Sequence, residues 1–138
     1  AGDLSVCGAP NGYLVVDVKG DDVKWHFKPT KGSFNQQFFA YLPGQFRTQV
    51  GMVVANVWDY DPSCKVQYYE DGVFKGDMGQ FADIDDHYIY QQHRLGKKVS
   101  DDRLTGHLFR FKPSKGTKNI TIEFTNHFGE KYTQTYQL

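Results

Sequence analysis

Runs in which apolar and polar residues alternate recur along most of the chain. In the clearest of them, Val23, Trp25 and Phe27 alternate with charged or polar side chains, which predicts a strand with one buried face. Similar runs cover residues 13–18, 107–112, 120–125 and 132–138. Clusters of Gly, Pro, Asn and Asp separate the runs about every ten residues, as in β-sandwiches. The pattern predicts an all-β protein of about eight or nine short strands.

The stretch from residue 52 to residue 76 contains the strongest local signals. Val53 to Trp58 are largely apolar in both alternating sets, which predicts a strand covered on both faces. The next four residues, Asp-Tyr-Asp-Pro, are expected to end it, because Asp and Pro favour turns. Asp71-Gly72 separates two β-forming runs and is typical of a tight hairpin turn in which both residues have a positive φ. A further strand is predicted for residues 36–42.

Residues 84–95 are the exception to the strand pattern. Their apolar or aromatic residues recur close to a helical period, with acidic residues at the start and basic residues at the end, which suits a helix dipole. These residues are Ile84, Tyr88 and Leu95, with Asp85 and Asp86 in the first turn and His93 and Arg94 in the last. Gly96 is expected to end the helix. The predicted fold is an immunoglobulin-like antiparallel β-sandwich with one short helix near residues 84–95.

Composition limits the classes of protein to which the chain can belong. A length of 138 residues fits one domain, and we expect an N-terminal loop segment at residues 1–9 followed by a single sandwich at 10–138. Sixteen basic and sixteen acidic residues balance, which argues against a nucleic-acid partner. No apolar run is long enough to cross a bilayer. Cys7 and Cys64 are too few for a disulfide scaffold, and we favour two separate thiols over a bond between them.

Short matches to metal-ligand motifs occur at three places, but each lacks the required context. A two-metal hydrolytic site needs several Asp, His and Asn ligands gathered at strand ends. Asp85-Asp86-His87 lies in the predicted helix, and Gly106-His107 is followed by Phe109 where a second His is needed. Asn126-His127 is preceded by Thr rather than Gly. We interpret all three as chance matches. The chain is therefore predicted to contain no catalytic residue and no metal ligand of this kind.

The turn after the central strand contains the candidate ligand-binding residues. Trp58 and Tyr60 lie beside two carboxylates, those of Asp59 and Asp61, and could stack on sugar rings; we favour core or interface packing for the two rings. The carboxylates could also bind Ca²⁺ together with Asp83, Asp85 or Asp86. Because Ca²⁺ takes six to eight oxygens and no suitable spacing supplies them, we favour capping of turns by these aspartates.

Several short segments together resemble one known family, the C-terminal domain of bacterial calcineurin-like metallophosphoesterases. They occur in the family's order and span nearly the whole chain from residue 10 onward. The segments are Pro10-Asn11-Gly12-Tyr13, Trp25-His26-Phe27-Lys28-Pro29, Tyr41-Leu42-Pro43-Gly44, Asn56-Val57-Trp58-Asp59-Tyr60-Asp61-Pro62, Tyr69-Glu70-Asp71-Gly72, His107-Leu108-Phe109-Arg110 and Phe128-Gly129-Glu130-Lys131-Tyr132-Thr133. The match is weakest over residues 81–102.

The resemblance implies a parent enzyme with an N-terminal β-domain, a central two-metal phosphoesterase domain and this domain last. The parent would be extracytoplasmic, either periplasmic or secreted, and would use two divalent metal ions, none of them held by this chain. The expected role is that of a non-catalytic accessory domain whose partner is the catalytic domain of the same polypeptide. The alternative is a carbohydrate- or cell-envelope-binding module that uses Trp58, Asp59, Tyr60 and Asp61.

Overall fold

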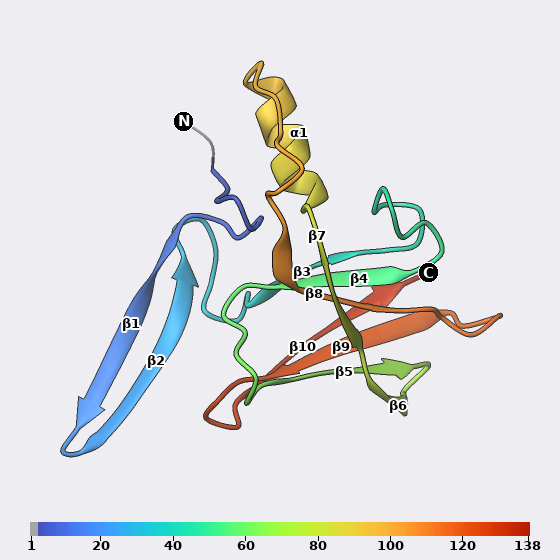
Figure 1. The fold of residues 1–138 in the computed structure, drawn as a ribbon. Coiled ribbons are helices and arrows are strands. Elements are labelled where there is room, and N and C mark those ends of the chain that lie inside the picture. The colour runs from blue at the N-terminus through green and yellow to red at the C-terminus, as the bar shows by residue number, and fades with distance from the viewer. Residues whose placement is uncertain (1–2) are drawn as a thin grey trace.

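The computed structural model describes residues 3–138 and contains two four-stranded antiparallel sheets that face each other (Figure 1). One sheet has the order β3 (Phe38–Tyr41), β4 (Val53–Val57), β8 (Thr105–Phe111) and β7 (Gly79–Asp83). The other has the order β10 (Lys131–Gln137), β9 (Asn119–Thr125), β5 (Lys65–Glu70) and β6 (Val73–Asp77). If β3 is taken as strand A, these are the orders A-B-E-D and G-F-C-C′ of an immunoglobulin-like sandwich. The predicted fold class is confirmed.

The main core lies between the two sheets. Strand β4 contributes Val53, Ala55 and Val57, which are fully buried and face Ile122 and Phe124 of the opposite sheet within one hydrophobic cluster. The other face of β4 is also buried, because the segment between β3 and β4 covers it in a second, smaller cluster. That cluster contains Tyr41, Phe46, Val54 and Leu108. The sequence prediction of a strand covered on both faces is therefore confirmed.

The helix and the tight hairpin turn also match the sequence pattern. The turn between β5 and β6 has positive φ at both Asp71 and Gly72, as the Asp-Gly dipeptide predicts. Helix α1 (Asp86–Arg94) is shorter than the predicted 84–95, because Asp85 is its N-cap and Leu95 its C-cap. Gly96 follows with a positive φ and ends the helix. Within residues 3–138, no helix is long and apolar enough to span a membrane.

Two strand assignments differ from the sequence prediction. Strand β3 occupies only residues 38–41 of the predicted 36–42. Just before its start, the side-chain amide of Gln37 donates to the backbone carbonyls of Phe27 and Phe34. Just after its end, the backbone N–H of Leu42 donates to the side chain of Gln45. Strand β7 was not predicted, because its sequence, Gly-Gln-Phe-Ala-Asp, lacks an apolar alternation. Residues 3–138 therefore form ten strands.

Strands β1 (Gly12–Lys19) and β2 (Asp22–Pro29) pair only with each other and form a hairpin outside both sheets. The hairpin extends from the sandwich at the lower left of Figure 1. Gly20 occupies the first position of its two-residue turn with φ 59°, which suits a glycine. Residues 3–11 precede the hairpin and lie between its base and α1 (Figure 1).

Truncating a side chain between the sheets tests this architecture. Ile122 is fully buried, so Ile122→Ala is expected to lower the free energy of unfolding by about 2–5 kcal/mol, as buried aliphatic truncations do. Val50→Ala is the control, because Val50 is 68% exposed and its truncation should change stability by about 0.5 kcal/mol or less. Urea unfolding followed by tryptophan fluorescence measures both variants. Equal effects of the two substitutions would contradict the assigned core.

Candidate functional site

The turn that follows β4 holds the four candidate ligand-binding residues, but their rings face different neighbours. Trp58 lies edge-on to Phe27 of the hairpin, with ring centroids 6.0 Å apart. Tyr60 packs edge-on against Phe109 of the core, with centroids 4.9 Å apart. Both side chains are half-buried. The two rings therefore do not form one open platform, and a sugar site at this turn remains a prediction with less support than packing.

The two carboxylates of this turn differ in environment. Asp61 accepts hydrogen bonds from the backbone N–H and the hydroxyl of Ser63, and these bonds lower its pKa. It therefore caps its own turn, as expected from the sequence. Burial raises the pKa of Asp59, and the nearby charge of Asp61 adds to the rise. Asp59 is thus the less readily ionised of the pair.

The joint between the β1–β2 hairpin and the sandwich lies at the same end of the sandwich. Trp25 stacks on His127 with centroids 5.6 Å apart and lies edge-on to Phe128 at 4.7 Å. On the other face of β2, the ring Nε2 of His26 is 2.7 Å from Oε1 of Glu130, and this hydrogen bond lowers the pKa of Glu130. The turn between β9 and β10 therefore contacts both faces of β2. Nothing in the sequence relates residues 25 and 26 to residues 127–130, so this joint was not predicted.

A second joint centres on the buried carboxylate of Asp85, which is 1% exposed. Its oxygens accept from the hydroxyl of Tyr41 at 3.0 Å, from Nδ2 of Asn56 at 2.9 Å and from the backbone N–H groups of His87 and Tyr88 at 3.0 and 3.2 Å. Burial and the Asp85 charge raise the pKa of Tyr41, so its hydroxyl keeps the proton that it donates. The carboxylate thus links strands β3 and β4 to the start of α1.

Asn56 extends this joint to the N-terminal segment. The same Nδ2 that donates to Asp85 also donates to the backbone carbonyl of Cys7 at 2.9 Å. Further along, Gln91 of α1 receives a hydrogen bond from the backbone N–H of Leu4 and donates to its carbonyl, at 2.8 and 3.1 Å. Residues 4–8 are therefore fixed against both the sandwich and the helix.

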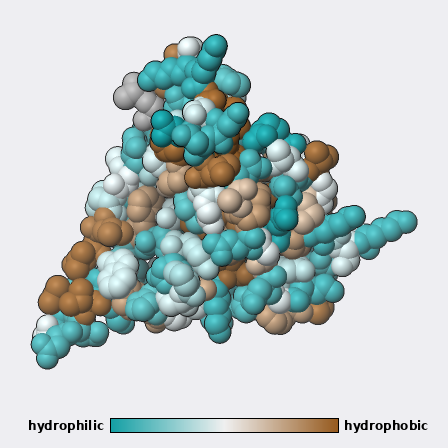
Figure 2. All heavy atoms as spheres, viewed as in Figure 1, coloured by the Kyte–Doolittle hydropathy of each residue, from teal (hydrophilic) through white to brown (hydrophobic). Residues whose placement is uncertain are grey.

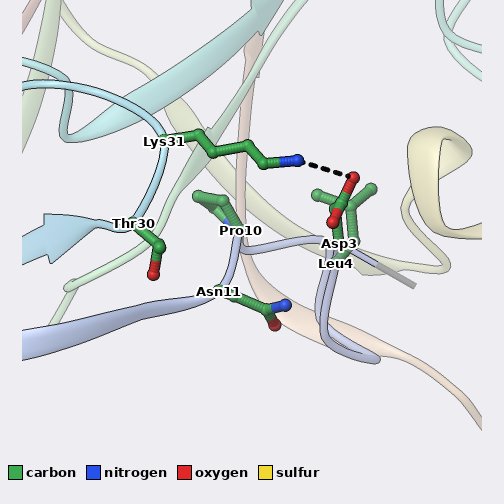
Figure 3. A pocket seen from close by; sticks show the side chains of 6 residues that line it. All are labelled: Asp3, Leu4, Pro10, Asn11, Thr30 and Lys31. Atoms are coloured by element: carbon green, nitrogen blue, oxygen red, sulfur yellow. Dashed lines mark hydrogen bonds and ion pairs between the residues drawn. The ribbon is translucent and has the colours of Figure 1, made fainter. Parts of the chain in front are cut away.

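A small hollow marks the place where the N-terminal segment passes the base of the hairpin (Figure 3). It has a volume of about 120 Å³ and is lined by Leu4, Pro10 and Thr30 among others. Nζ of Lys31 and Oδ2 of Asp3 lie 3.5 Å apart across it. Small-molecule sites usually measure roughly 300–1,000 Å³. We interpret the hollow as a gap between crossing segments and not as a ligand site.

The remaining aspartates that were considered as metal ligands have protein partners. Asp83 and Asp86 both pair with the guanidinium of Arg47 at 3.4 Å, and Asp86 also accepts from the backbone N–H of Arg47 at 2.6 Å. Burial raises the pKa of Asp86 despite this cation. Within residues 3–138, no three His, Cys, Asp or Glu side chains gather as a metal site would require. The acidic residues near α1 therefore act as caps and ion-pair partners.

Both cysteines are free thiols in the described part of the chain, as favoured from the sequence, and their environments are opposite. Cys64 is buried, and burial raises its pKa. A hydrogen bond from His107 lowers the pKa of Cys7 to about 7, and the hydroxyl of Ser5, 3.1 Å from its sulfur, contributes to this shift. Cys7 is therefore the more reactive thiol at neutral pH.

Comparison with known proteins identifies the family. The chain matches the family described as the C terminal of calcineurin-like phosphoesterase over residues 2–132, which is nearly its whole length. It belongs to this family, as the sequence resemblance indicated. Neither the curated proteins nor the solved structures contained a match.

Replacing Asp85 tests its structural role. Asp85→Asn places an NH₂ group opposite the donors from which the carboxylate accepts. We expect the free energy of unfolding to fall by about 2–4 kcal/mol, because a buried donor without a partner costs about 1–3 kcal/mol and a lost cap about 1 kcal/mol. Asp101→Asn, in an exposed loop, is the control and should be nearly neutral. Thermal unfolding by circular dichroism measures both. A D85N protein as stable as D101N would contradict the assigned network.

The low pKa of Cys7 predicts a specific pH dependence of thiol alkylation. The rate of Cys7 modification by iodoacetamide should rise with pH and reach its half-maximal value near pH 7. His107→Leu removes the hydrogen bond that favours the thiolate, so the midpoint should move upward by about one unit or more. Peptide mass spectrometry measures the rate, and the buried Cys64 in the same sample should react slowly at every pH. An unchanged midpoint in H107L, with a native circular dichroism spectrum, would exclude this role of His107.

Proposed function

We propose that this chain is a non-catalytic accessory domain of a larger calcineurin-like phosphoesterase and that it packs against the catalytic part of the same polypeptide. Its membership in the family of C-terminal domains places it in a phosphoesterase polypeptide. The hydrophobic core between the two sheets supports an independently folded unit. The chemistry would then belong to the preceding domain.

The observation that carries this proposal is the structural use of the acidic side chains. A two-metal phosphoesterase site needs several carboxylate and imidazole ligands that point into one cleft. In this chain the buried Asp85 caps α1 and binds Tyr41 and Asn56, while Asp83 and Asp86 pair with Arg47. These groups therefore do not fit a pair of divalent ions.

The parent enzyme is proposed to hold two divalent metal ions outside this chain. Such ions would stabilise the attacking and leaving oxygens of a phosphate ester during hydrolysis. An extracytoplasmic location of the parent, either periplasmic or secreted, is proposed on the sequence resemblance. No residue of this chain is assigned to the reaction.

Activity assays of the isolated chain test the proposal. The chain should not hydrolyse p-nitrophenyl phosphate or bis(p-nitrophenyl) phosphate, with or without added Mn²⁺ or Zn²⁺, because residues 3–138 contain no gathered metal-ligand set. The positive control is the full parent polypeptide, assayed with the same metals. Turnover by the isolated chain that persists at constant specific activity through a second purification would refute the non-catalytic role.

A further inference from the structure

The β1–β2 hairpin lacks the support that a two-stranded sheet needs. An isolated two-stranded hairpin is marginally stable in water unless a hydrophobic face packs against something. Neither β1 nor β2 pairs with a strand of the sandwich. The ring contacts and the side-chain hydrogen bond that join the hairpin to the sandwich come from Trp25, His26 and Phe27 on β2. Strand β1 and the half of the hairpin near its turn extend beyond these contacts (Figure 1).

The register of the hairpin gathers its apolar side chains on one face. Leu14 pairs with Phe27, Val16 with Trp25 and Val18 with Val23, so all six lie on the same side. The opposite side pairs Asp17 with Lys24 and Val15 with His26. That more polar side borders a groove next to the body, lined by Asp17, His26 and Glu130 among others. The hairpin is therefore amphipathic, and its register specifies a face to be buried.

The body covers only the base of the apolar face. Trp25 and Phe27 are half-buried against Phe128 and Trp58. The other four side chains, which we call the apolar patch, are exposed. They are Leu14 at 54%, Val16 at 56%, Val18 at 64% and Val23 at 45%. Brown, hydrophobic spheres follow the hairpin at the lower left of Figure 2.

We infer that the apolar patch is the surface through which this domain docks on the phosphoesterase domain of its own polypeptide, an inference that rests on the proposed function. Contiguous exposed apolar patches larger than a few hundred Å² are uncommon on monomeric proteins and mark interaction sites. Charged side chains at the hairpin turn, those of Lys19, Asp21 and Asp22, border the patch. An apolar centre with a polar rim is the usual composition of a protein interface.

The fixed course of the N-terminal segment indicates this partner. In this family the phosphoesterase part precedes the C-terminal domain, so the connection enters through the segment that leads into β1. That segment is held by hydrogen bonds of Leu4 to Gln91 and of the Asn11 N–H to the carbonyl of Asp3. A domain that precedes this segment would therefore be connected near the base of the hairpin, beside which residues 3–11 run (Figure 1).

The size of the patch also favours a partner within the same polypeptide over a second copy of the chain. A stable complex of separate proteins usually buries about 800 Å² on each side, from roughly 20–30 residues. The patch consists of only four aliphatic side chains. A tethered partner is present at an effective concentration in the millimolar range, at which such a small contact suffices.

Hydrogen–deuterium exchange of the hairpin amides, residues 13–28, tests the inference. It is measured in the isolated chain and in the full parent polypeptide. Docking should make these amides exchange about tenfold more slowly in the parent, because opening then requires undocking. Val16→Thr with Val18→Thr keeps the β-branched shape but makes the patch polar, and should abolish the difference. The matched control is Val50→Thr with Val73→Thr, two valines exposed elsewhere at 68% and 62%.

The outcomes separate this inference from the proposed function. Docking through the patch would be overturned if the hairpin exchanged equally in the wild-type isolated chain and the wild-type parent, or if the protection survived V16T/V18T. An inactive isolated chain would still support an accessory role in that case. Protection of the isolated chain that rises with its concentration, together with a dimer by ultracentrifugation, would overturn it in favour of a second copy. Turnover by the isolated chain would instead refute the proposed function.

Discussion

The arrangement of the domain depends on one buried carboxylate. Asp85 is almost inaccessible to water, and a buried charge is costly unless hydrogen bonds replace its hydration. Here the hydroxyl of Tyr41, the amide of Asn56 and the first backbone N–H groups of α1 supply those bonds. These donors come from separate segments of the chain. The cost of leaving the charge unsatisfied therefore holds β3, β4 and the helix in one relative position.

This constraint reaches the N-terminal segment through close packing. A Cβ atom added to Gly8 would clash with Cγ of Asp85, and Gly8 also has a positive φ. Only glycine lets the backbone pass so close to the carboxylate. Asn56 donates hydrogen bonds to both Asp85 and the backbone carbonyl of Cys7, and it thereby fixes the residue next to Gly8. The course of the N-terminal segment is thus set by the same network that caps α1.

The sequence was most informative where a short segment carries its own signal. The Asp71-Gly72 turn, the doubly covered strand β4 and the Gly96 terminus of α1 each depend on the conformational preferences of a few adjacent residues. Strand β7 has no such signal, since it is specified by pairing with β8, a partner distant in the sequence. Asp85 was assigned to the first turn of the helix. Its role as the cap that also binds Tyr41 and Asn56 depends on contacts across 44 and 29 residues, which no local pattern reveals.

The candidate site also shows that a local sequence pattern does not reveal which neighbour buries a side chain. An aromatic residue at a strand end predicts a contact surface without saying which neighbour covers it. Trp58 is covered by the hairpin and Tyr60 by the core. The hairpin is the reverse case. Its alternation predicts one buried face, as in β9, yet Val16 and Val18 are exposed while Ile120 and Ile122 are not. An amphipathic pattern reports that burial is needed but not which molecule provides it. Within the described chain the sandwich satisfies that need for β9, whereas the hairpin is left with a face that a neighbouring domain is suited to cover.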